Sequence, residues 1–409
     1  MLDTLNTSEV SITFLALFLL LLFSFIGGKF FELIKAPKVV GEILGGMVLG
    51  GSCIAYFFPD LFQSIFSYYP EEHKVLNVFY QLGLTFLMFS SGYSTSINIT
   101  KKNIKNYSLL FVGATIIPML LGSLFVVLFK DSFIGSANNT LAFSFVFIIS
   151  VAITSIPVIS KIFFDIGMMN TKFSDMVLTV STLQDLVLWI LLNLSISLVE
   201  TGEFRILSFI ITTFITIGLL FAAKMVAWLV KKYNLTIRKN VLPVSFLLLF
   251  LIVYLLSKIN VNIMYSAFVG GYLMRALLPD DNCDVEKIKN FAMSLFVPIY
   301  FALVGIQLDV IHNFSLLRFL LFFVIAFGLE FIGTVGFMWF TKLKRKTVLS
   351  LGITMNARGG PGIVLATTAF AYNIINIEFF TVLILTTMLS SALAGYWLRI
   401  FKSDIQNDG

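Results

Sequence analysis

The sequence has little of what most soluble proteins and enzymes depend on. Only 12% of its 409 residues are charged, whereas 58% are hydrophobic, and the mean hydropathy is +0.96. Two cysteines and two histidines exclude a disulfide framework and argue against a metal centre built from these residues. The sequence has no His-Glu-x-x-His motif, no Gly-x-Ser-x-Gly motif and no nucleotide-binding loop. We therefore expect no enzyme, no cofactor and no nucleic-acid partner.

Hydrophobic runs of about 20 residues, long enough to cross a bilayer as helices, recur along the chain. The first, Ile12–Ile26, has no basic segment before it and no small-residue cleavage site, which indicates a retained helix rather than a signal peptide. The sequence predicts an all-α polytopic protein in contact with membrane lipids, a single transporter domain over residues 1–409 without a soluble regulatory domain. About thirteen membrane-spanning helices are expected, roughly at residues 10–34, 38–58, 74–97, 106–130, 140–165, 173–199, 204–230, 240–257, 260–277, 288–308, 316–341, 347–372 and 376–400.

Basic residues are distributed unequally between the two sets of alternate loops. One set and the C-terminal tail carry twenty lysines and arginines, the other set carries five, and three lie within spans. Because basic loops stay on the cytoplasmic side, the first set is predicted to be cytoplasmic. We therefore expect a multi-pass protein of the cytoplasmic membrane, with the N-terminus outside and the C-terminus inside, as an odd number of spans requires.

Asp185 stands in the hydrophobic run from about Met176 to Leu198. An acid at that depth is costly to insert and marks a functional site by default. On a helix it shares a face with Thr182 and Ser181, one turn earlier. These oxygens would suit a proton or a dehydrated alkali cation. The alternative is that Asp185 pairs with a buried basic residue and only fixes the packing.

Two of the predicted spans contain helix breaks at matching places. Pro157 follows Thr154 and Ser155 in the fifth span, and the sequence Asn356-Ala357-Arg358-Gly359-Gly360-Pro361-Gly362 interrupts the twelfth. Paired interruptions of this kind indicate a transporter with inverted repeats and a site at the membrane midplane. We expect five-helix repeats at residues 38–199 and 260–401, joined by helices at 200–258. Taken singly, a proline or glycine here could be only a kink or a close helix contact, as we expect for Gly41, Gly45, Gly46 and Gly50.

At these residues the chain resembles a known family. The segment from Pro37 to Gly46, the Thr-Ser-x-Pro-Val break, the Gln184-Asp185 pair and the Arg358-Gly359 segment resemble the monovalent cation:proton antiporters, in the branch with the Kef-type potassium efflux systems, Nap-type sodium/proton antiporters and plant cation/proton exchangers. The resemblance implies a Nap-type fold with crossed discontinuous helices, a homodimer, elevator-like alternating access and a part in pH homeostasis.

The resemblance also implies roles for individual residues. Asp185 would carry the ion and the proton, with Gln184 beside it. Thr154 and Ser155 would lie next to the alkali cation, so that the metal ligands would include Asp185 and Thr154. Arg358 would stabilise the crossing, where it could face a helix C-terminus or an acid, and Pro157, Asn356, Gly359, Gly360 and Pro361 would shape the two breaks.

The chain departs from the family pattern at Glu330, where many members have a lysine. If Glu330 faces Asp185, the two carboxylates would share one proton, which a monovalent cation could replace; this favours electroneutral exchange. Alternatively, Glu330 points to another helix, toward Arg358 or a water. The pair Gln184-Asp185 itself is typical of the Kef-type and plant exchangers.

The function predicted from the sequence is secondary antiport of Na⁺ or K⁺ against H⁺. Two alternatives stay open: a Kef-like cation efflux channel, which would conduct without proton counterflow, and a cation-coupled transporter of an organic solute. A separate regulatory subunit is a possible partner. The choice between Na⁺ and K⁺ depends on ligand geometry, which the sequence does not specify.

Overall fold

The computed structural model describes residues 5–34, 37–94, 104–169, 171–201, 218, 225, 241–258, 263–277, 283–308 and 310–406. Within these residues the chain is almost entirely helical, with one isolated β-bridge between Ile134 and Ile375. Seven of the described helices are long and hydrophobic enough to cross a membrane. The predicted span at 204–230 lies outside the described residues except for two positions, so the count of thirteen stays a prediction.

The chain divides into two compact units, each made of two separate stretches of sequence. The first unit comprises Met1–Ser94 and Thr216–His312, and the second comprises Thr95–Ile215 and Asn313–Gly409. Each unit thus takes one stretch from each half of the chain. The boundaries of the inverted repeats stay a prediction.

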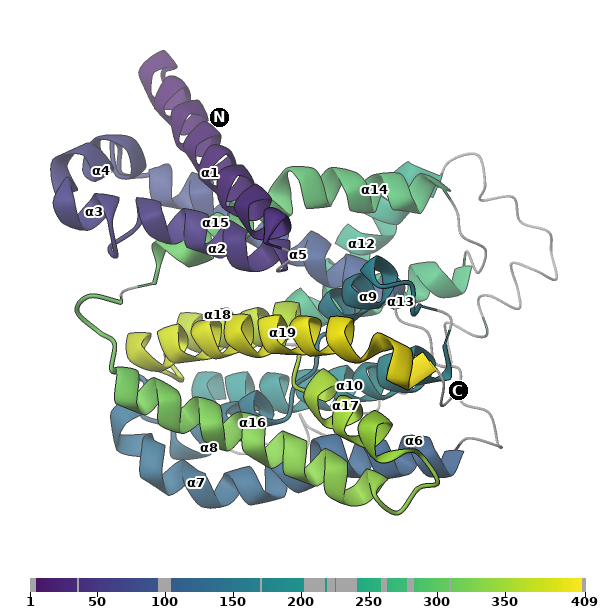
Figure 1. Cartoon of the computed structure of the whole chain (residues 1–409). Coiled ribbons are helices and arrows are strands. Elements are labelled where there is room, and N and C mark those ends of the chain that lie inside the picture. Colours follow the sequence, from purple (N-terminus) through teal and green to yellow (C-terminus); the bar gives the residue numbers. More distant parts are fainter. Residues whose placement is uncertain are drawn as a thin grey trace. The chain divides into compact units, whose positions relative to one another are not determined.

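The first unit contains the described helices α1 (Thr7–Leu33), α2 (Lys38–Leu49), α3 (Ile54–Phe57), α4 (Pro59–Phe66), α5 (Glu72–Ser94), α12 (Val241–Ser257), α13 (Ile263–Leu277), α14 (Cys283–Ser294) and α15 (Phe296–Ile306). The second contains α6 (Ile104–Phe111), the π-helical turn η1 (Val112–Ile116), α7 (Ile117–Phe133), α8 (Thr140–Val151), α9 (Ile156–Asp165), α10 (Lys172–Thr201), α16 (Leu316–Met338), α17 (Arg345–Met355), α18 (Gly359–Ala371) and α19 (Ile377–Gln406). Figure 1 labels most of these elements.

In the first unit, glycines bring helix backbones into direct contact. A Cβ at Gly41 would lie 2.1 Å from the Gly27 carbonyl oxygen of α1, and one at Gly46 would lie 2.0 Å from the Ala302 carbonyl oxygen of α15. Gly45 and Gly50 are equally confined. The expectation that these four glycines serve close helix contacts is therefore confirmed, and α2 packs between α1 and α15 through them.

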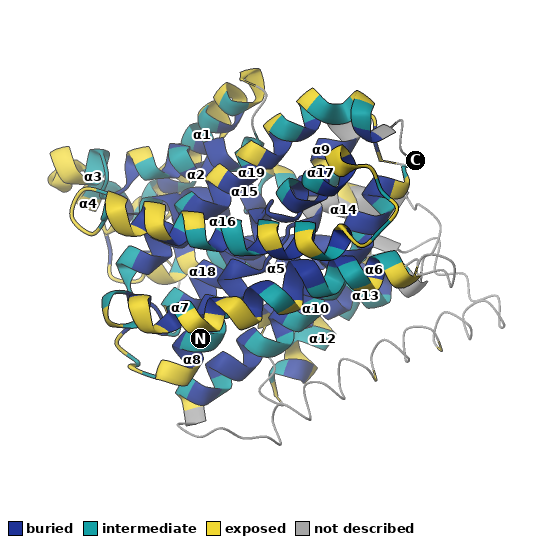
Figure 2. Cartoon of the chain, turned by 60° about the horizontal axis from the view of Figure 1, so that its bottom comes forward, coloured by how far each residue is buried: buried dark blue, intermediate teal, exposed yellow. Residues whose placement is uncertain are grey.

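In the second unit, aromatic rings hold together α7, α8, α16 and α19. Phe133 and Phe379 stack with ring centroids 4.5 Å apart, and Phe147 and Phe322 pack against Phe379. Helix α18 lies alongside α19 and is buried along almost its whole length (Figures 1 and 2). Helix α18 begins at one of the two helix breaks, and these breaks form the candidate site.

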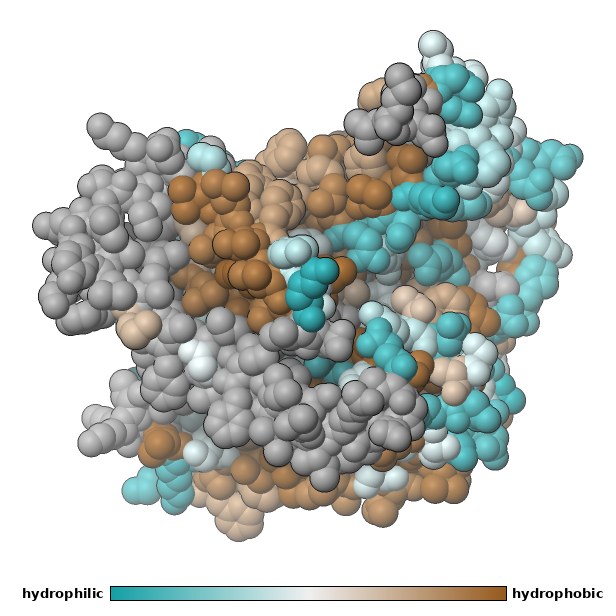
Figure 3. Space-filling view, turned by 180° about the vertical axis from the view of Figure 1, so that it is seen from behind, coloured by the Kyte–Doolittle hydropathy of each residue, from teal (hydrophilic) through white to brown (hydrophobic). Residues whose placement is uncertain are grey.

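On the face that Figure 3 shows, hydrophobic side chains form several patches. On α7, for example, the side chains of Leu120, Leu124, Val127 and Leu128 are exposed. Exposed leucine and valine rows on a helix of membrane-spanning length indicate contact with lipid.

Several element boundaries differ from those expected. The expected span at 38–58 is present as a candidate membrane span over Lys38–Phe57, within which α2 ends at Leu49 and the short helix α3 follows. The expected span at 288–308 is two helices, α14 and α15, which meet at Leu295. The expected span at 106–130 contains η1, which the hydrophobic pattern did not indicate. The two predicted breaks, after Val151 and after Met355, are both present.

Candidate functional site: two broken helices and a buried acid

The two helix breaks of the second unit meet and hydrogen bond to each other. The Ser155 backbone N–H donates to the Ala357 carbonyl oxygen at 2.6 Å. The Thr154 hydroxyl donates to the Met355 carbonyl oxygen at the end of α17. The Gly360 backbone N–H donates to the Ser155 hydroxyl at 3.2 Å. Backbone groups left open by each break are therefore satisfied by the other, which is how unwound backbone persists at membrane depth.

Proline and glycine act at the beginning of the second half of each broken helix. Pro157 is the second residue of α9, where its missing N–H costs no helical hydrogen bond. Gly359 begins α18 with a φ of +40°, and a Cβ there would lie 2.4 Å from the Ser155 hydroxyl oxygen. At Gly360 nothing lies within 4 Å of such a Cβ, and Pro361 follows in the first turn of α18. Only Gly359 is thus required by both backbone conformation and space.

Arg358 joins the two breaks through one nitrogen of its guanidinium group. Nη2 donates to the Val151 carbonyl oxygen at 3.1 Å, to a Glu330 oxygen at 3.1 Å and to the Asn356 side-chain oxygen at 3.2 Å. Val151 is the last residue of α8, so Arg358 serves a helix C-terminus and an acid at the same time. Asn356 is itself fixed, because its amide donates to the Gly352 carbonyl oxygen at 2.9 Å.

Glu330 lies on α16 and is completely buried. One carboxylate oxygen accepts from Arg358 at 3.1 Å, and the other accepts from the Thr154 hydroxyl at 3.3 Å. Of the two arrangements that the sequence left open, the structure shows the one with Arg358. Within the described residues no hydrogen bond supports a proton shared between Glu330 and Asp185, because the Asp185 carboxylate makes none there.

Asp185 lies in the middle of α10, a helix that packs against α8, α9, α17 and α18. It is 1% exposed, and neither of its carboxylate oxygens has a hydrogen-bond partner within the described residues. The predicted alternative, a buried basic partner, is therefore not present there. The charged form of a carboxylate that is removed from water without a partner is strongly unfavourable. Binding of a proton or a cation would therefore stabilise Asp185.

The other oxygens on α10 differ in availability. The Thr182 hydroxyl donates to the Leu178 carbonyl oxygen of its own helix at 2.9 Å. The Ser181 hydroxyl and the Gln184 side-chain oxygen are buried without partners in the described part of the chain, while the Gln184 amide nitrogen donates to the Ala114 carbonyl oxygen at 3.0 Å. The oxygens of Ser181 and Gln184 are thus held by no hydrogen bond among the described residues, whereas Thr182 is fixed to its own helix and keeps its lone pairs.

Two contributors to this region were missed from the sequence. Ser391 on α19 accepts a hydrogen bond from the Gly359 backbone N–H at 3.1 Å, and Ala114 of η1 holds Gln184. The polar run Thr386, Thr387, Ser390 and Ser391 in an otherwise hydrophobic helix was a usable signal for the first. A backbone carbonyl such as that of Ala114 leaves no signal in the sequence.

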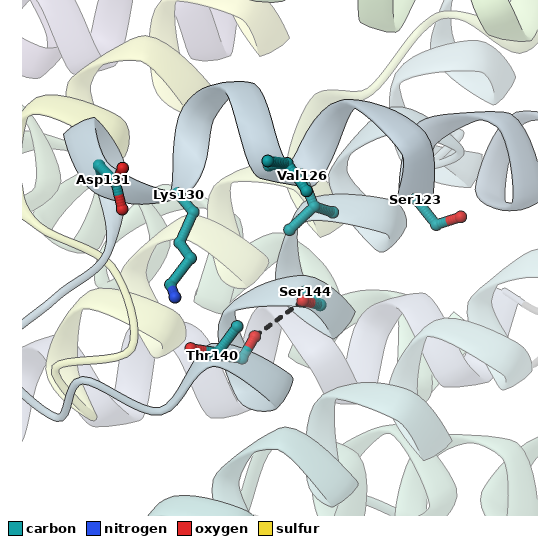
Figure 4. A pocket seen from close by; sticks show the side chains of 7 residues that line it. Ser123, Val126, Lys130, Asp131, Thr140 and Ser144 are labelled. Atoms are coloured by element: carbon teal, nitrogen blue, oxygen red, sulfur yellow. Dashed lines mark hydrogen bonds between the residues drawn. The ribbon is translucent and has the colours of Figure 1, made fainter.

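A separate cavity of about 470 Å³ lies between α7 and α8. It is lined by Ser123, Val126, Val127, Lys130, Asp131, Thr140 and Ser144, and Figure 4 shows Lys130 extending toward Thr140. None of the predicted site residues lines it, so we treat it as distinct from the ion site.

Known proteins resemble this chain in both sequence and fold. The family model for "Sodium/hydrogen exchanger, transmembrane" matches residues 17–402. The chain is 24% identical over 390 residues to Cation/H(+) antiporter 19 of Arabidopsis thaliana, covering 92% of this chain and 48% of that protein. It is 26% identical over 387 residues to the Na(+)/H(+) antiporter NhaS4 of Synechocystis, covering 90% and 92%. It is 23% identical over 404 residues to K(+)/H(+) antiporter 1 of Saccharomyces cerevisiae, covering 93% of this chain and 45% of that protein.

The chain thus spans about half the length of the plant and yeast relatives, but nearly the whole of the cyanobacterial one. The structure of the sodium proton antiporter MjNhaP1 from Methanocaldococcus jannaschii superposes with a TM-score of 0.66 at 18% identity, covering 97% of this chain and 99% of that chain. This likeness shows a shared fold of the NhaP type. Because the family match covers nearly the whole chain and the fold agrees with it, this protein belongs to the sodium/hydrogen exchangers among the monovalent cation:proton antiporters.

Proposed function

We propose that this protein is a secondary antiporter that exchanges Na⁺ or K⁺ for H⁺ across a membrane, with Asp185 as the carrier. The observation that carries the proposal is the fully buried, unpartnered carboxylate of Asp185, on a helix packed against both broken helices. The names of the relatives support the reaction, since they describe exchange of cations, Na⁺ or K⁺ for H⁺.

The charge balance supports one-for-one, electroneutral exchange. Glu330 and Arg358 form an ion pair 3.1 Å apart, so together they contribute no net charge. Asp185 is then the one described acid at the crossing without a compensating group. If it binds one proton in one half of the cycle and one monovalent cation in the other, no net charge moves. This reason differs from the shared proton inferred from the sequence, but it leads to the same stoichiometry.

Cation ligands would come from the oxygens near Asp185. Ser181 and Gln184 offer buried oxygens without partners among the described residues, whereas the single O–H of Thr154 is shared between the Met355 carbonyl and Glu330, which fixes its orientation but leaves its lone pairs. The Ser155 hydroxyl oxygen accepts from the backbone N–H groups of both Gly360 and Val158, which occupies its two lone pairs and fixes its position. We therefore rank Asp185, Ser181 and Gln184 above Thr154 and Ser155 as ligands in this conformation.

An elevator mechanism needs a compact body that contains the whole site. Every candidate residue, from Thr154 to Arg358, belongs to the second unit. This supports elevator-like alternating access, which stays a prediction together with the homodimer, the cell-membrane location and the orientation of the termini. Several loop lysines used for the orientation, including Lys101 and Lys231, lie outside the described residues.

The test uses purified protein in liposomes with a trapped pH dye and an imposed proton gradient. Na⁺, K⁺ and Li⁺ are added in turn, with the wild type and Asp185→Asn, and with and without an imposed voltage. Cation-dependent proton movement that is absent in Asp185→Asn and insensitive to voltage supports electroneutral antiport and ranks the ions. Voltage-sensitive exchange refutes the charge-balance argument, and cation flux without proton movement refutes antiport in favour of a channel.

A further inference from the structure

The helix from Ile104 to Phe133 is interrupted by η1, a single π-helical turn at Val112–Ile116. Such turns are rare, and they frequently occur at functional sites because they change the direction of side chains and free backbone carbonyl groups. This one is buried at Gly113, Ala114 and Thr115. It lies inside the second unit, which also contains the ion site.

On one side η1 touches the backbone of α16. A Cβ at Gly333 would lie 2.3 Å from the Gly113 carbonyl oxygen, and a Cβ at Gly113 would lie 2.6 Å from the Gly333 carbonyl oxygen. Real Cβ atoms do not approach oxygen so closely, so both positions need glycine. Gly333 is three residues after Glu330, and η1 is therefore held by the helix that forms the Glu330–Arg358 pair.

On the other side η1 holds Gln184. The Gln184 amide nitrogen donates to the Ala114 carbonyl oxygen at 3.0 Å, and the Gln184 side chain is buried. A carbonyl oxygen can only accept a hydrogen bond, so the NH₂ group of the Gln184 amide must be the end that faces η1. The Gln184 oxygen is consequently turned away from η1, buried and without a partner among the described residues, next in sequence to Asp185.

We propose that η1 is a positioning element of the cation site, which holds the Gln184 amide so that its oxygen, and not its NH₂ group, is available beside Asp185. This inference rests on the proposed cation/proton exchange. An amide oxygen stabilises a bound cation. An NH₂ group in its place would donate to the ionised carboxylate, stabilise the empty charged site and compete with cation and proton alike.

The test compares two glycine variants of α16 with one variant of Gln184 and a control variant on α10. Gly333→Ala pushes η1 away from α16, whereas Gly336→Ala on the same helix is the matched control, because nothing lies within 4 Å of its Cβ. Gln184→Met removes both the donor and the oxygen. Ser195→Ala, which removes only a hydroxyl bonded to the Leu191 carbonyl of its own helix, is the control on α10. The readouts are the cation KM and maximal rate of exchange in liposomes, and the rise in melting temperature caused by Na⁺ or K⁺ in detergent.

We expect Gln184→Met and Gly333→Ala to raise the cation KM about tenfold, as for the loss of one hydrogen-bonding oxygen, and to reduce the cation-induced rise in melting temperature. Gly336→Ala and Ser195→Ala should match the wild type in both. Loss of a cation ligand should raise the KM while the maximal rate of the folded variant stays close to that of the wild type, a split that a general loss of structure would not produce.

The proposal is overturned if Gln184→Met keeps the wild-type cation KM and melting shift, or if folded Gly333→Ala behaves like Gly336→Ala. If Gly333→Ala does not fold, Gln184→Met decides. The melting shift separates this inference from the proposed exchange. A wild type that is stabilised by the cation but moves no protons refutes the antiport, while loss of that stabilisation in Gln184→Met still supports the role of η1.

Discussion

The surroundings of two buried acids in the same unit differ in one respect. Glu330 accepts hydrogen bonds from Arg358 and Thr154, whereas the two oxygens of Asp185 accept none from the described residues. Both side chains are almost completely removed from solvent. Burying a charge is costly unless it is paired, and Glu330 has a partner inside the protein. In the proposed exchange, the transported proton or cation compensates Asp185, so burial without a partner is the feature by which we propose the carrier.

The largest expected effect is that of Asp185→Asn on transport. The amide cannot be protonated or bind a cation with a full charge, so exchange should be abolished for every cation tested. The protein should stay folded, with a melting temperature equal to or above that of the wild type, because an unpaired buried acid has been removed. Dye-loaded liposomes and thermal unfolding in detergent check both points. Residual cation-driven proton movement in this variant would show that another group carries the proton.

The reverse result is expected for the Glu330–Arg358 pair. Glu330→Gln or Arg358→Gln leaves one buried charge without its partner and should destabilise the protein by about 3–5 kcal/mol, seen as a lower melting temperature and a lower yield of folded protein. The double variant should be less destabilised than the sum of the two single variants. Equal destabilisation by Asp185→Asn and Arg358→Gln would remove the distinction between the two acids.

An intermediate effect is expected at the crossing itself, where two adjacent glycines provide a matched pair. Gly359→Ala places a Cβ 2.4 Å from the Ser155 hydroxyl oxygen at a φ of +40°, and should cost about 1–3 kcal/mol. Gly360→Ala meets nothing within 4 Å and should be close to neutral. Melting temperatures of the two variants give the comparison. If both are neutral, the crossing is looser than its hydrogen bonds indicate.

Features based on local chemistry were predictable from the sequence. Both helix breaks follow from proline and glycine, whose backbone limits act within a few residues. Asp185 stood out because an acid in a hydrophobic run is rare at any membrane depth. Arg358 was expected to face a helix C-terminus or an acid, and it contacts both: the Val151 carbonyl oxygen at the end of α8 and the Glu330 carboxylate.

Features that depend on contacts between distant residues were not predictable. Whether Glu330 faces Asp185 or Arg358 depends on the rotation of α16, and a hydrophobic pattern on a largely apolar helix does not specify this rotation. The π-helical turn η1 contains Gly113, whose backbone contacts Gly333, a residue 220 positions away in the sequence. The ion selectivity depends on such distances as well, which is why the residue types near Asp185 do not decide between Na⁺ and K⁺.

The smallest expected effect extends the comparison to the first unit, where Glu42 and Glu72 are also buried and Glu42 forms an ion pair. Lys38 Nζ lies 2.9 Å from its carboxylate, whose side chain is only 5% exposed, while the pair Lys29–Glu32, also at 2.9 Å, has side chains exposed by 58% and 37%. Lys38→Met leaves a buried carboxylate without its partner and should cost about 1–3 kcal/mol. Lys29→Met should cost less than about 0.5 kcal/mol, because exposed pairs contribute little. Thermal unfolding of the two variants measures the difference.

Transport provides the second half of this test. If a partner is what separates a structural acid from a carrier, Glu42 should resemble Glu330, and both lysine variants should retain the wild-type cation KM and pH profile in liposomes. A change in KM or pH profile for Lys38→Met alone would mean that the unpaired Glu42 has begun to bind protons or cations. That outcome would make the absence of a partner sufficient for ion binding in this protein, and not only necessary, because Glu42 belongs to the first unit, outside the one that holds Asp185.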